Sequence, residues 1–86
     1  MKIKDGYLLR DVAGSHVVVS VGNVDFDGMI RLNDTGVFLW KKLSEGIDEK
    51  ALVEALLAEY DVAKDVAERD VSEFVDGLRK AALLDE

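Results

Sequence analysis

The apolar residues of this chain change their spacing at Leu32, and that change constrains the fold more than any other feature. Before Leu32 they are dense and β-branched, and four of the six residues from His16 to Val21 are valine. After Leu32 they recur every three or four positions, which is the period of an amphipathic helix. A run of strands followed by a run of helices predicts an α+β domain.

Three short strands are expected in the first third of the chain. Their predicted positions are Tyr7 to Val12, His16 to Val21 after a turn at Gly14-Ser15, and Met29 to Leu32. Gly22-Asn23 and Asp27-Gly28 are turn signals around Val24-Asp25-Phe26. Strands joined by such short connections favour a three-stranded antiparallel meander.

Three helices are expected after Leu32. Their predicted bounds are Asn33 or Asp34 as a cap to about Ser44, Asp48 as a cap to about Tyr60, and a start between Val62 and Asp65 to about Lys80. Gly46 is suited to end the first helix, because glycine tolerates the left-handed conformation common after a helix. Asn33 also has a second interpretation, as a residue that contacts a ligand at the end of the third strand.

Each expected helix carries an apolar stripe. The stripes are Leu32, Leu39, Trp40 and Leu43; Leu52, Val53, Leu56, Leu57 and Tyr60; and Ala67, Val71, Phe74, Leu78 and Ala81 with Val75 at the margin. Phe38 lies opposite the first stripe, so the first helix is expected to be buried on several sides between the sheet and the other helices. Trp40 is expected in the core, and Leu83-Leu84 is expected to fold back as an apolar clip.

Length, composition and charge exclude several classes of protein. With 86 residues, 49% of them hydrophobic, the chain is expected to form one domain over residues 1–86. It has no cysteine for a disulfide or a Cys-based zinc site. No apolar run approaches the ~20 residues that span a bilayer, so a cytoplasmic, soluble protein without membrane contact is expected. Residues 47–86 carry twelve acidic and five basic side chains, which opposes nucleic-acid binding.

Residue patterns typical of catalysis are absent from the sequence. The single histidine, His16, begins a strand and is expected to be structural or exposed. No serine lies in a nucleophile motif, and the glycines form no phosphate-binding loop. Asp25 and Asp27 lack the spacing and the terminal glutamate of a calcium loop and are interpreted as turn residues. No enzymatic activity, metal or cofactor is therefore expected.

The order and spacing of several motifs resemble one family. Residues 28–40 contain the pattern L-N-x-T-G-x-x-x-W, from Leu32 to Trp40. Gly46, the segment Tyr60-Asp61-Val62 and the helix from Asp70 to Leu78 follow, and Leu9-Arg10-Asp11-Val12 precedes a valine-rich strand. This arrangement, over about residues 8–84, resembles the PqqD-like family, also called RiPP recognition elements. The resemblance implies a winged-helix-like domain of three strands followed by three helices.

The resemblance also implies a function and a site. Family members bind the leader of a ribosomally made precursor peptide as an added strand and present it to a modifying enzyme, often a radical-SAM protein. The resemblance places that peptide between the third strand and the third helix. The implied contact residues are Met29, Ile30, Arg31, Leu32, Ala67, Asp70, Val71, Phe74, Val75 and Leu78. The expected partners are the leader peptide and that enzyme, and the chain itself is expected to be a monomer or weak homodimer.

Some features depart from the family pattern, and some questions stay open. Ala82 replaces a glycine that often precedes the final Leu-Leu, and Ala63 replaces a polar helix cap. The chain lacks a Pro-Glu-Gly segment associated with PqqD itself, so the pathway is not assigned to pyrroloquinoline quinone. Whether the amide of Ile30 faces the ligand or the neighbouring strand is left open. The alternatives are a scaffolding subunit without leader contact and, less favoured, a winged-helix nucleic-acid binder.

Overall fold

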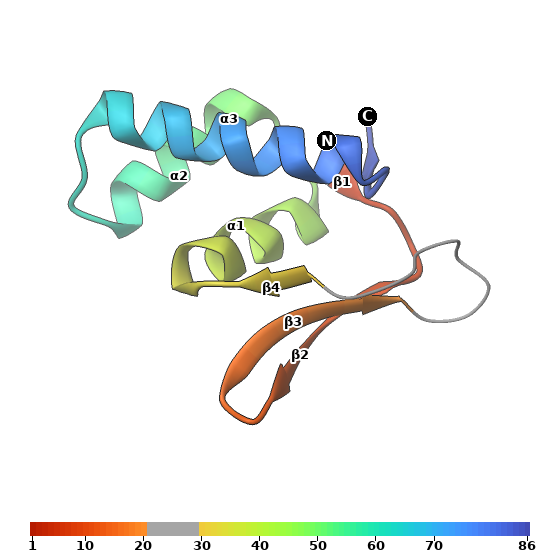
Figure 1. The fold of residues 1–86 in the computed structure, drawn as a ribbon. Helices are drawn as coiled ribbons and strands as arrows, with labels where there is room; N and C mark the ends of the chain where they lie inside the picture. Colours follow the sequence, from red (N-terminus) through yellow and green to blue (C-terminus); the bar gives the residue numbers. More distant parts are fainter. Residues whose placement is uncertain (21–29) are drawn as a thin grey trace.

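A computed structural model of the chain describes residues 1–20 and 30–86. In chain order its elements are β1 (Lys2–Ile3), β2 (Tyr7–Val12), β3 (Ser15–Ser20), β4 (Ile30–Leu32), α1 (Asp34–Glu45), α2 (Glu49–Glu59), α3 (Lys64–Lys80) and β5 (Leu84–Asp85). The three-stranded antiparallel sheet β2-β3-β4 followed by three helices confirms the predicted α+β class. In Figure 1 α1 lies between this sheet and the layer formed by α2 and α3.

The β2–β3 hairpin closes through a two-residue turn. Val12 pairs with Ser15, and the turn residues Ala13 and Gly14 both have positive φ angles, 51° and 82°. Two positive φ values in a two-residue loop are typical of a type I′ turn, whose twist matches that of the strands. The turn therefore lies one residue earlier than predicted, and β3 begins at Ser15.

The strand β4 is shorter than its prediction and lies at an edge of the sheet. It pairs with β3 from Ile30 to Leu32, and β3 separates it from β2. Met29, Val21 and the predicted strand and turn signals of residues 22–28 lie outside the described residues. Within the described ranges, no further strand pairs with the other side of β4.

The start of α1 is set by two residues next to β4. The Asn33 side chain accepts a hydrogen bond of 2.8 Å from the N–H of Gly36, so Asn33 is the predicted N-cap. Gly36 is buried, and a Cβ there would lie 3.2 Å from the cap oxygen and 3.3 Å from Leu32 Cβ. The glycine thus lets the helix begin directly against the strand. Gly46, with φ 93°, ends the helix as predicted.

The other two helices also begin where predicted. Asp48 caps α2 by accepting from the N–H of Ala51 at 2.7 Å. Ala63 precedes α3 without a side-chain hydrogen bond. At the end of α3 the N–H of Leu83 donates to Leu78, and Ala82 has φ 61°. Ala82 therefore adopts the left-handed conformation that a glycine would favour at this position.

The core confirms the predicted stripe of α1. Leu39, Trp40 and Leu43 are buried, and Trp40 is 3% exposed. On the opposite side of α1, Phe38 is half-buried and packs edge-on against Tyr60, with ring centroids 5.6 Å apart. The helix is therefore enclosed by both layers, as its apolar residues on several sides predicted.

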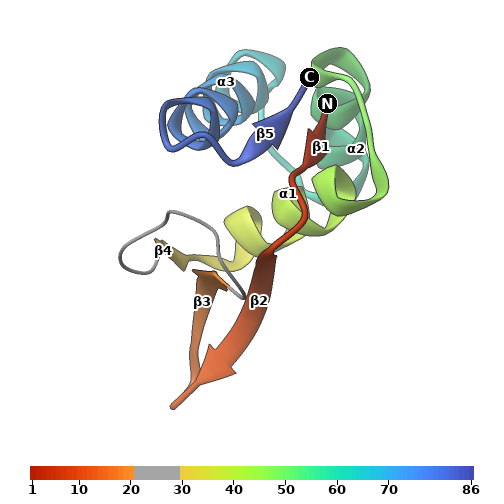
Figure 2. The same ribbon diagram turned by 90° about the vertical axis from the view of Figure 1, so that its right-hand side faces the viewer.

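A second small sheet joins the two ends of the described chain. Ile3 of β1 pairs with Leu84 of β5, and the N–H of Lys4 donates to Leu83 at 2.9 Å. Figure 2 shows the two strands side by side next to the helices. Leu83 and Leu84 are buried, which confirms the predicted clip. The sequence did not predict this sheet, because two-residue strands are too short for a periodic pattern.

Candidate functional site

The hairpin register determines which backbone groups of β3 face β2. In a two-residue hairpin the closing pair, here Val12 and Ser15, is hydrogen-bonded, and hydrogen-bonded and non-hydrogen-bonded pairs then alternate along the ladder. Two residues further on, Val17 therefore bonds to Arg10. The residues between these bonded positions turn their N–H and C=O groups to the other side of β3.

The same alternation determines which backbone groups of β4 face outward. His16 and Val18 face β4 and pair with Leu32 and Ile30, so the backbone groups of those two residues point into the sheet. Arg31, opposite Val17, turns its N–H and C=O toward the side of β4 that no described strand pairs with. The open question about Ile30 is thereby answered: its amide faces β3, and Arg31 has the outward donor.

Three adjoining hollows lie beside this edge and share Phe74. Their volumes are about 440, 510 and 380 Å³, and together they extend along β4 to the start of α1. We call them the β4–α3 groove, lined by Ile30, Arg31, Leu32, Asn33, Thr35, Gly36, Leu39, Asp70, Glu73, Phe74, Gly77, Leu78 and Ala81. The outward-facing backbone of β4 therefore lies next to an apolar wall, which is formed by Phe74 and Leu78 in the C-terminal half of α3 and by Ala81 at its C-cap.

The predicted contact residues divide into two groups. Ile30, Arg31, Leu32, Asp70, Phe74 and Leu78 line the groove. Ala67, Val71 and Val75 have no exposed surface in this structure and belong to the core cluster. A period of 3.6 identifies the apolar face of α3 but does not distinguish packing within the chain from packing on a ligand. Met29 lies outside the described residues.

Several groove residues were missing from the set of predicted contact residues. Glu73 and Gly77 flank Phe74 at the exposed margin of the α3 stripe, and Thr35 lies in the first turn of α1. A Cβ built at Gly77 would have no atom within 4 Å. The sequence signal for Gly77 was its unusual place inside a helix, where glycine is unfavourable by ~1 kcal/mol relative to alanine.

The charged groups around the groove have opposite signs on its two walls. Arg31 is exposed on β4, whereas α3 contributes Asp70 and Glu73. The Asp70 carboxylate lies 4.0 Å from Arg69, its neighbour in sequence. A peptide in the groove would therefore meet a positive side chain along the strand and negative ones along the helix.

Other ionisable groups near the sheet and the C-terminal end have structural partners. His16 is half-buried, and its Nδ1 contacts the carboxylate of Asp11 across the hairpin. Arg79 donates to both carboxylate oxygens of Glu86 at 2.8 and 2.7 Å, and this bonding lowers the pKa of Glu86. Nowhere in residues 1–20 and 30–86 do three His, Asp or Glu side chains gather as metal ligands. No helix in these ranges is long and apolar enough to cross a bilayer.

Comparison with solved structures finds proteins of the same fold. The structure "TbiB1 in Complex with the TbiA(beta) Leader Peptide" is 28% identical to this chain, with a TM-score of 0.78 over 99% of this chain and 95% of that one. The structure "Lasso peptide synthetase B1 complexed with the leader peptide" is 21% identical, with a TM-score of 0.74 over 95% and 93% of the two chains. The second likeness concerns the fold alone. No curated protein sequence matches the chain.

Comparison with protein families confirms the resemblance found in the sequence. The sequence model for "Coenzyme PQQ synthesis protein D (PqqD)" matches residues 15–84. The match includes the pattern from Leu32 to Trp40, whose asparagine caps α1 and whose glycine lets α1 begin against β4. Because the match covers most of the chain, this protein belongs to the PqqD family.

Proposed function

We propose that this protein recognises the leader of a ribosomally synthesised precursor peptide and presents it to a modifying enzyme. The observation that carries the proposal is the outward N–H and C=O of Arg31 beside the apolar wall around Phe74. A free strand edge binds an extended peptide through main-chain hydrogen bonds, and adjacent pockets select side chains. The likeness to TbiB1, whose structure contains a leader peptide, supports the same role for this chain.

The orientation of β4 predicts the side-chain pattern of the bound peptide. Ile30 and Leu32 point toward the helices, because they pair with Val18 and His16 on the sheet face that carries the core. Peptide residues opposite these two positions would also point toward the helices and lie over Phe74. The residue between them would lie beside the side chain of Arg31, where an acidic group is favoured.

The binding energy follows from the same contacts. The peptide orders when it binds, which costs conformational entropy, and the groove compensates through hydrogen bonds and apolar burial. Micromolar affinity, about −8 kcal/mol, is expected for a short added strand of this kind. Such a complex dissociates readily, as a module that delivers peptides to an enzyme requires.

The protein contributes binding rather than covalent chemistry in this proposal. The modifying enzyme, of the radical-SAM class or another, carries out the reaction, and the leader holds its substrate nearby. Because precursor and leader are made on cytoplasmic ribosomes, the proposed location is the cytoplasm. The protein needs no cofactor for this role.

Two variants at one position test the proposed strand addition. Arg31→Pro removes the outward N–H, whereas Arg31→Ala keeps that N–H and removes only the side chain. The ligand is a synthetic leader from a precursor encoded in a neighbouring reading frame, and calorimetry measures its affinity. We expect Arg31→Pro to weaken binding by about tenfold or more and Arg31→Ala to weaken it much less.

Amide-shift mapping of the unsubstituted protein completes the test. The proposal requires shifts concentrated at residues 30–32 and 70–78. Equal affinity in the two Arg31 variants, or shifts confined to α2, would contradict strand addition at β4. No binding by an authentic leader would favour the alternative of a scaffolding subunit without leader contact.

A further inference from the structure

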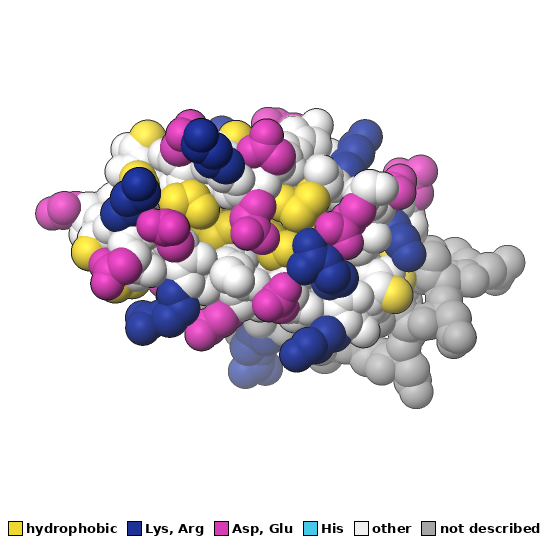
Figure 3. All heavy atoms as spheres, turned by 90° about the horizontal axis from the view of Figure 1, so that it is seen from above, with side chains coloured by type: hydrophobic (Ala, Val, Ile, Leu, Met, Phe, Trp, Pro, Cys, Tyr) yellow, Lys and Arg dark blue, Asp and Glu magenta, His cyan; other side chains and the backbone are white. Residues whose placement is uncertain are grey.

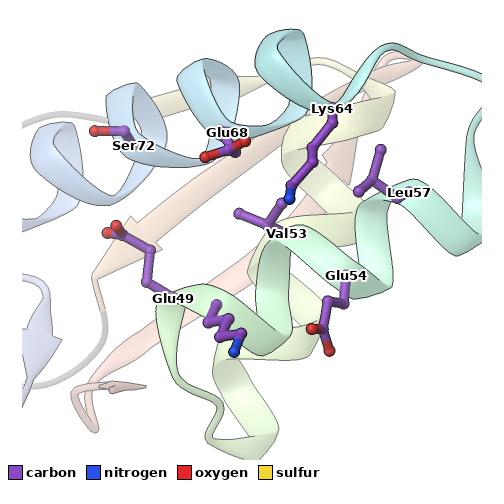
Figure 4. Close-up of a pocket in the computed structure, with 8 residues that line it drawn as sticks. Glu49, Val53, Glu54, Leu57, Lys64, Glu68 and Ser72 are labelled. Atoms are coloured by element: carbon purple, nitrogen blue, oxygen red, sulfur yellow. The ribbon is translucent and has the colours of Figure 1, made fainter.

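A separate hollow lies between α2 and α3, on the face turned away from the three-stranded sheet (Figure 1). It has a volume of about 490 Å³ and is lined by Glu49, Lys50, Val53, Glu54, Leu57, Lys64, Glu68 and Ser72. We call it the α2–α3 groove. Figure 3 shows apolar side chains in the middle of this face with charged side chains around them, and Figure 4 shows the lining residues.

The apolar part of this groove is incompletely buried. Leu52 and Leu56 of α2 are fully in the core, but Val53 and Leu57, one residue further along, are only half-buried. These two side chains lie at the margin of the α2 stripe and line the groove. An apolar side chain from another molecule would remove their remaining surface from water, which is favourable.

The charges around this groove are predominantly negative. Its lining includes three glutamates and two lysines, and residues 49–80 as a whole carry nine acidic and five basic side chains. Two of the five basic residues, Arg69 and Arg79, already lie beside carboxylates. With more acidic than basic side chains in its lining and a net charge of −7 on the whole chain, the groove presents an excess of negative charge.

The excess of negative charge selects among the molecules that could cover the groove. A second copy of the chain would bring the same acidic rim, and nucleic acid or an anionic lipid surface would bring phosphates. All three would place like charges together, which is unfavourable at an interface. A polypeptide segment with an apolar stripe and lysine or arginine at its margins satisfies both the apolar floor and the acidic rim.

The two grooves lie on opposite sides of α3. Glu68 and Ser72 face α2, whereas Phe74 and Gly77 line the β4–α3 groove. At 100° per residue, positions 68 and 72 are about half a turn away from positions 74 and 77. A ligand in one groove therefore leaves the other accessible.

We infer that the α2–α3 groove is the docking surface for a basic, amphipathic segment of the modifying enzyme. The identity of the partner rests on the proposed function, whereas the chemistry of the segment rests on the groove itself. A presenting module needs two separate surfaces, one for the leader and one for the enzyme. The opposite sides of α3 provide them.

The test uses a synthetic helical peptide with leucines on one face and lysines on its margins, about four turns long. A second peptide carries glutamate in place of every lysine. Both are titrated into the full chain while amide shifts are recorded. We expect the leucine-lysine peptide to shift residues 49–57 and 64–72, and the leucine-glutamate peptide not to bind.

Variants separate the groove from general charge attraction. The double variant Glu54→Lys/Glu68→Lys changes two exposed groove residues, and Glu45→Lys/Glu59→Lys makes the same change of net charge outside it. We expect the first to weaken binding of the leucine-lysine peptide by about tenfold and the second by less than about twofold. Val53→Thr keeps the shape of the side chain but places a hydroxyl group on the apolar floor of the groove, and it should therefore weaken binding of the leucine-lysine peptide.

Several outcomes would overturn the inference. These are equal weakening by both double variants, no effect of Val53→Thr, or shifts centred on residues 30–32. The proposed function is tested separately by titrating the synthetic leader into the Glu54→Lys/Glu68→Lys variant, where unchanged leader affinity is expected. Loss of leader binding in that variant would show that the two surfaces are not independent and would also contradict the inference.

Discussion

Among the described residues, the three-stranded sheet ends in β2 on one side and in β4 on the other, and the two edges differ in the features that a peptide-binding site needs. The β2 edge is six residues long, and the hairpin alternation turns the backbone of Leu9 and Asp11 outward. The β4 edge is three residues long and turns out the backbone of Arg31. By length alone, β2 would be the better template for an added strand.

The difference lies in what surrounds each edge. β4 lies beside α3 and the start of α1, so an added strand would meet an apolar wall as well as backbone groups. The outer part of the β2–β3 hairpin projects beyond the helices in Figure 1. Along β2, the side chains of Leu8 and Val12 are 44% and 52% exposed. Charged residues such as Arg10 and Asp11 protect an edge of this kind from pairing. A binding edge therefore requires a wall, not only free hydrogen-bonding groups.

The largest expected effect comes from disrupting the hydrophobic core that holds α3, and with it the wall, in place. Trp40→Ala should cost roughly 3–5 kcal/mol of stability, because Trp40 of α1 lies in the hydrophobic core and is only 3% exposed. A small domain has little more than this in total, and the hairpin alone is not stable. We expect a largely unfolded protein by circular dichroism and thermal melting. A cooperative melt near that of the unsubstituted protein would contradict the central position of Trp40.

The wall itself is tested by comparing one aromatic residue with one exposed residue of β2. Phe74→Ala should weaken leader binding by about 2 kcal/mol, because Phe74 is shared by all three hollows of the β4–α3 groove. Leu8→Ala, on the other edge, should leave leader affinity unchanged. Calorimetry on both variants measures the contrast. A stronger effect of Leu8→Ala would assign the peptide to β2 instead.

A smaller effect concerns the glycine in the groove. Gly77→Ala should raise stability by about 1 kcal/mol and weaken leader binding if the peptide backbone lies close to α3. Ala82→Gly is the matched control, because it relieves a positive φ outside the groove and should also add about 1 kcal/mol. Chemical denaturation and calorimetry separate the two quantities. Equal leader affinity in both variants would mean that the peptide backbone stays away from Gly77.

The smallest expected effect is pH-dependent and lies away from both edges. Hydrogen bonding to Arg79 holds the pKa of Glu86 below its ordinary value of 4.5. This pairing therefore contributes stability above pH 4.5, and the contribution disappears as the pH falls through the lowered pKa. Because both side chains are solvent-accessible, Glu86→Gln should change the melting temperature only slightly at pH 7 and not at low pH. A change in leader binding would link this end of α3 to the groove.

Much of the fold could be predicted from local patterns. The caps at Asn33 and Asp48 depend on hydrogen bonds between residues three positions apart, and the buried side of α1 that carries Trp40 is indicated by the spacing of apolar residues along one helix. Such contacts depend only on the geometry of a single helix or strand. The class of fold and the family pattern from Leu32 to Trp40 were therefore readable in the sequence.

The candidate site depended on relations between distant residues. The sequence showed an apolar stripe on α3, but only packing against α1 and α2 assigned Val71 and Val75 to the core and left Phe74 in the groove. The outward direction of the Arg31 backbone follows from a hairpin turn that lies one residue earlier than predicted. A shift of one residue along a ladder reverses which groups face the edge, because the backbone alternates with a period of two. The sequence by itself thus determined the elements and their buried faces, whereas the tertiary structure decided which atoms remain available to a ligand.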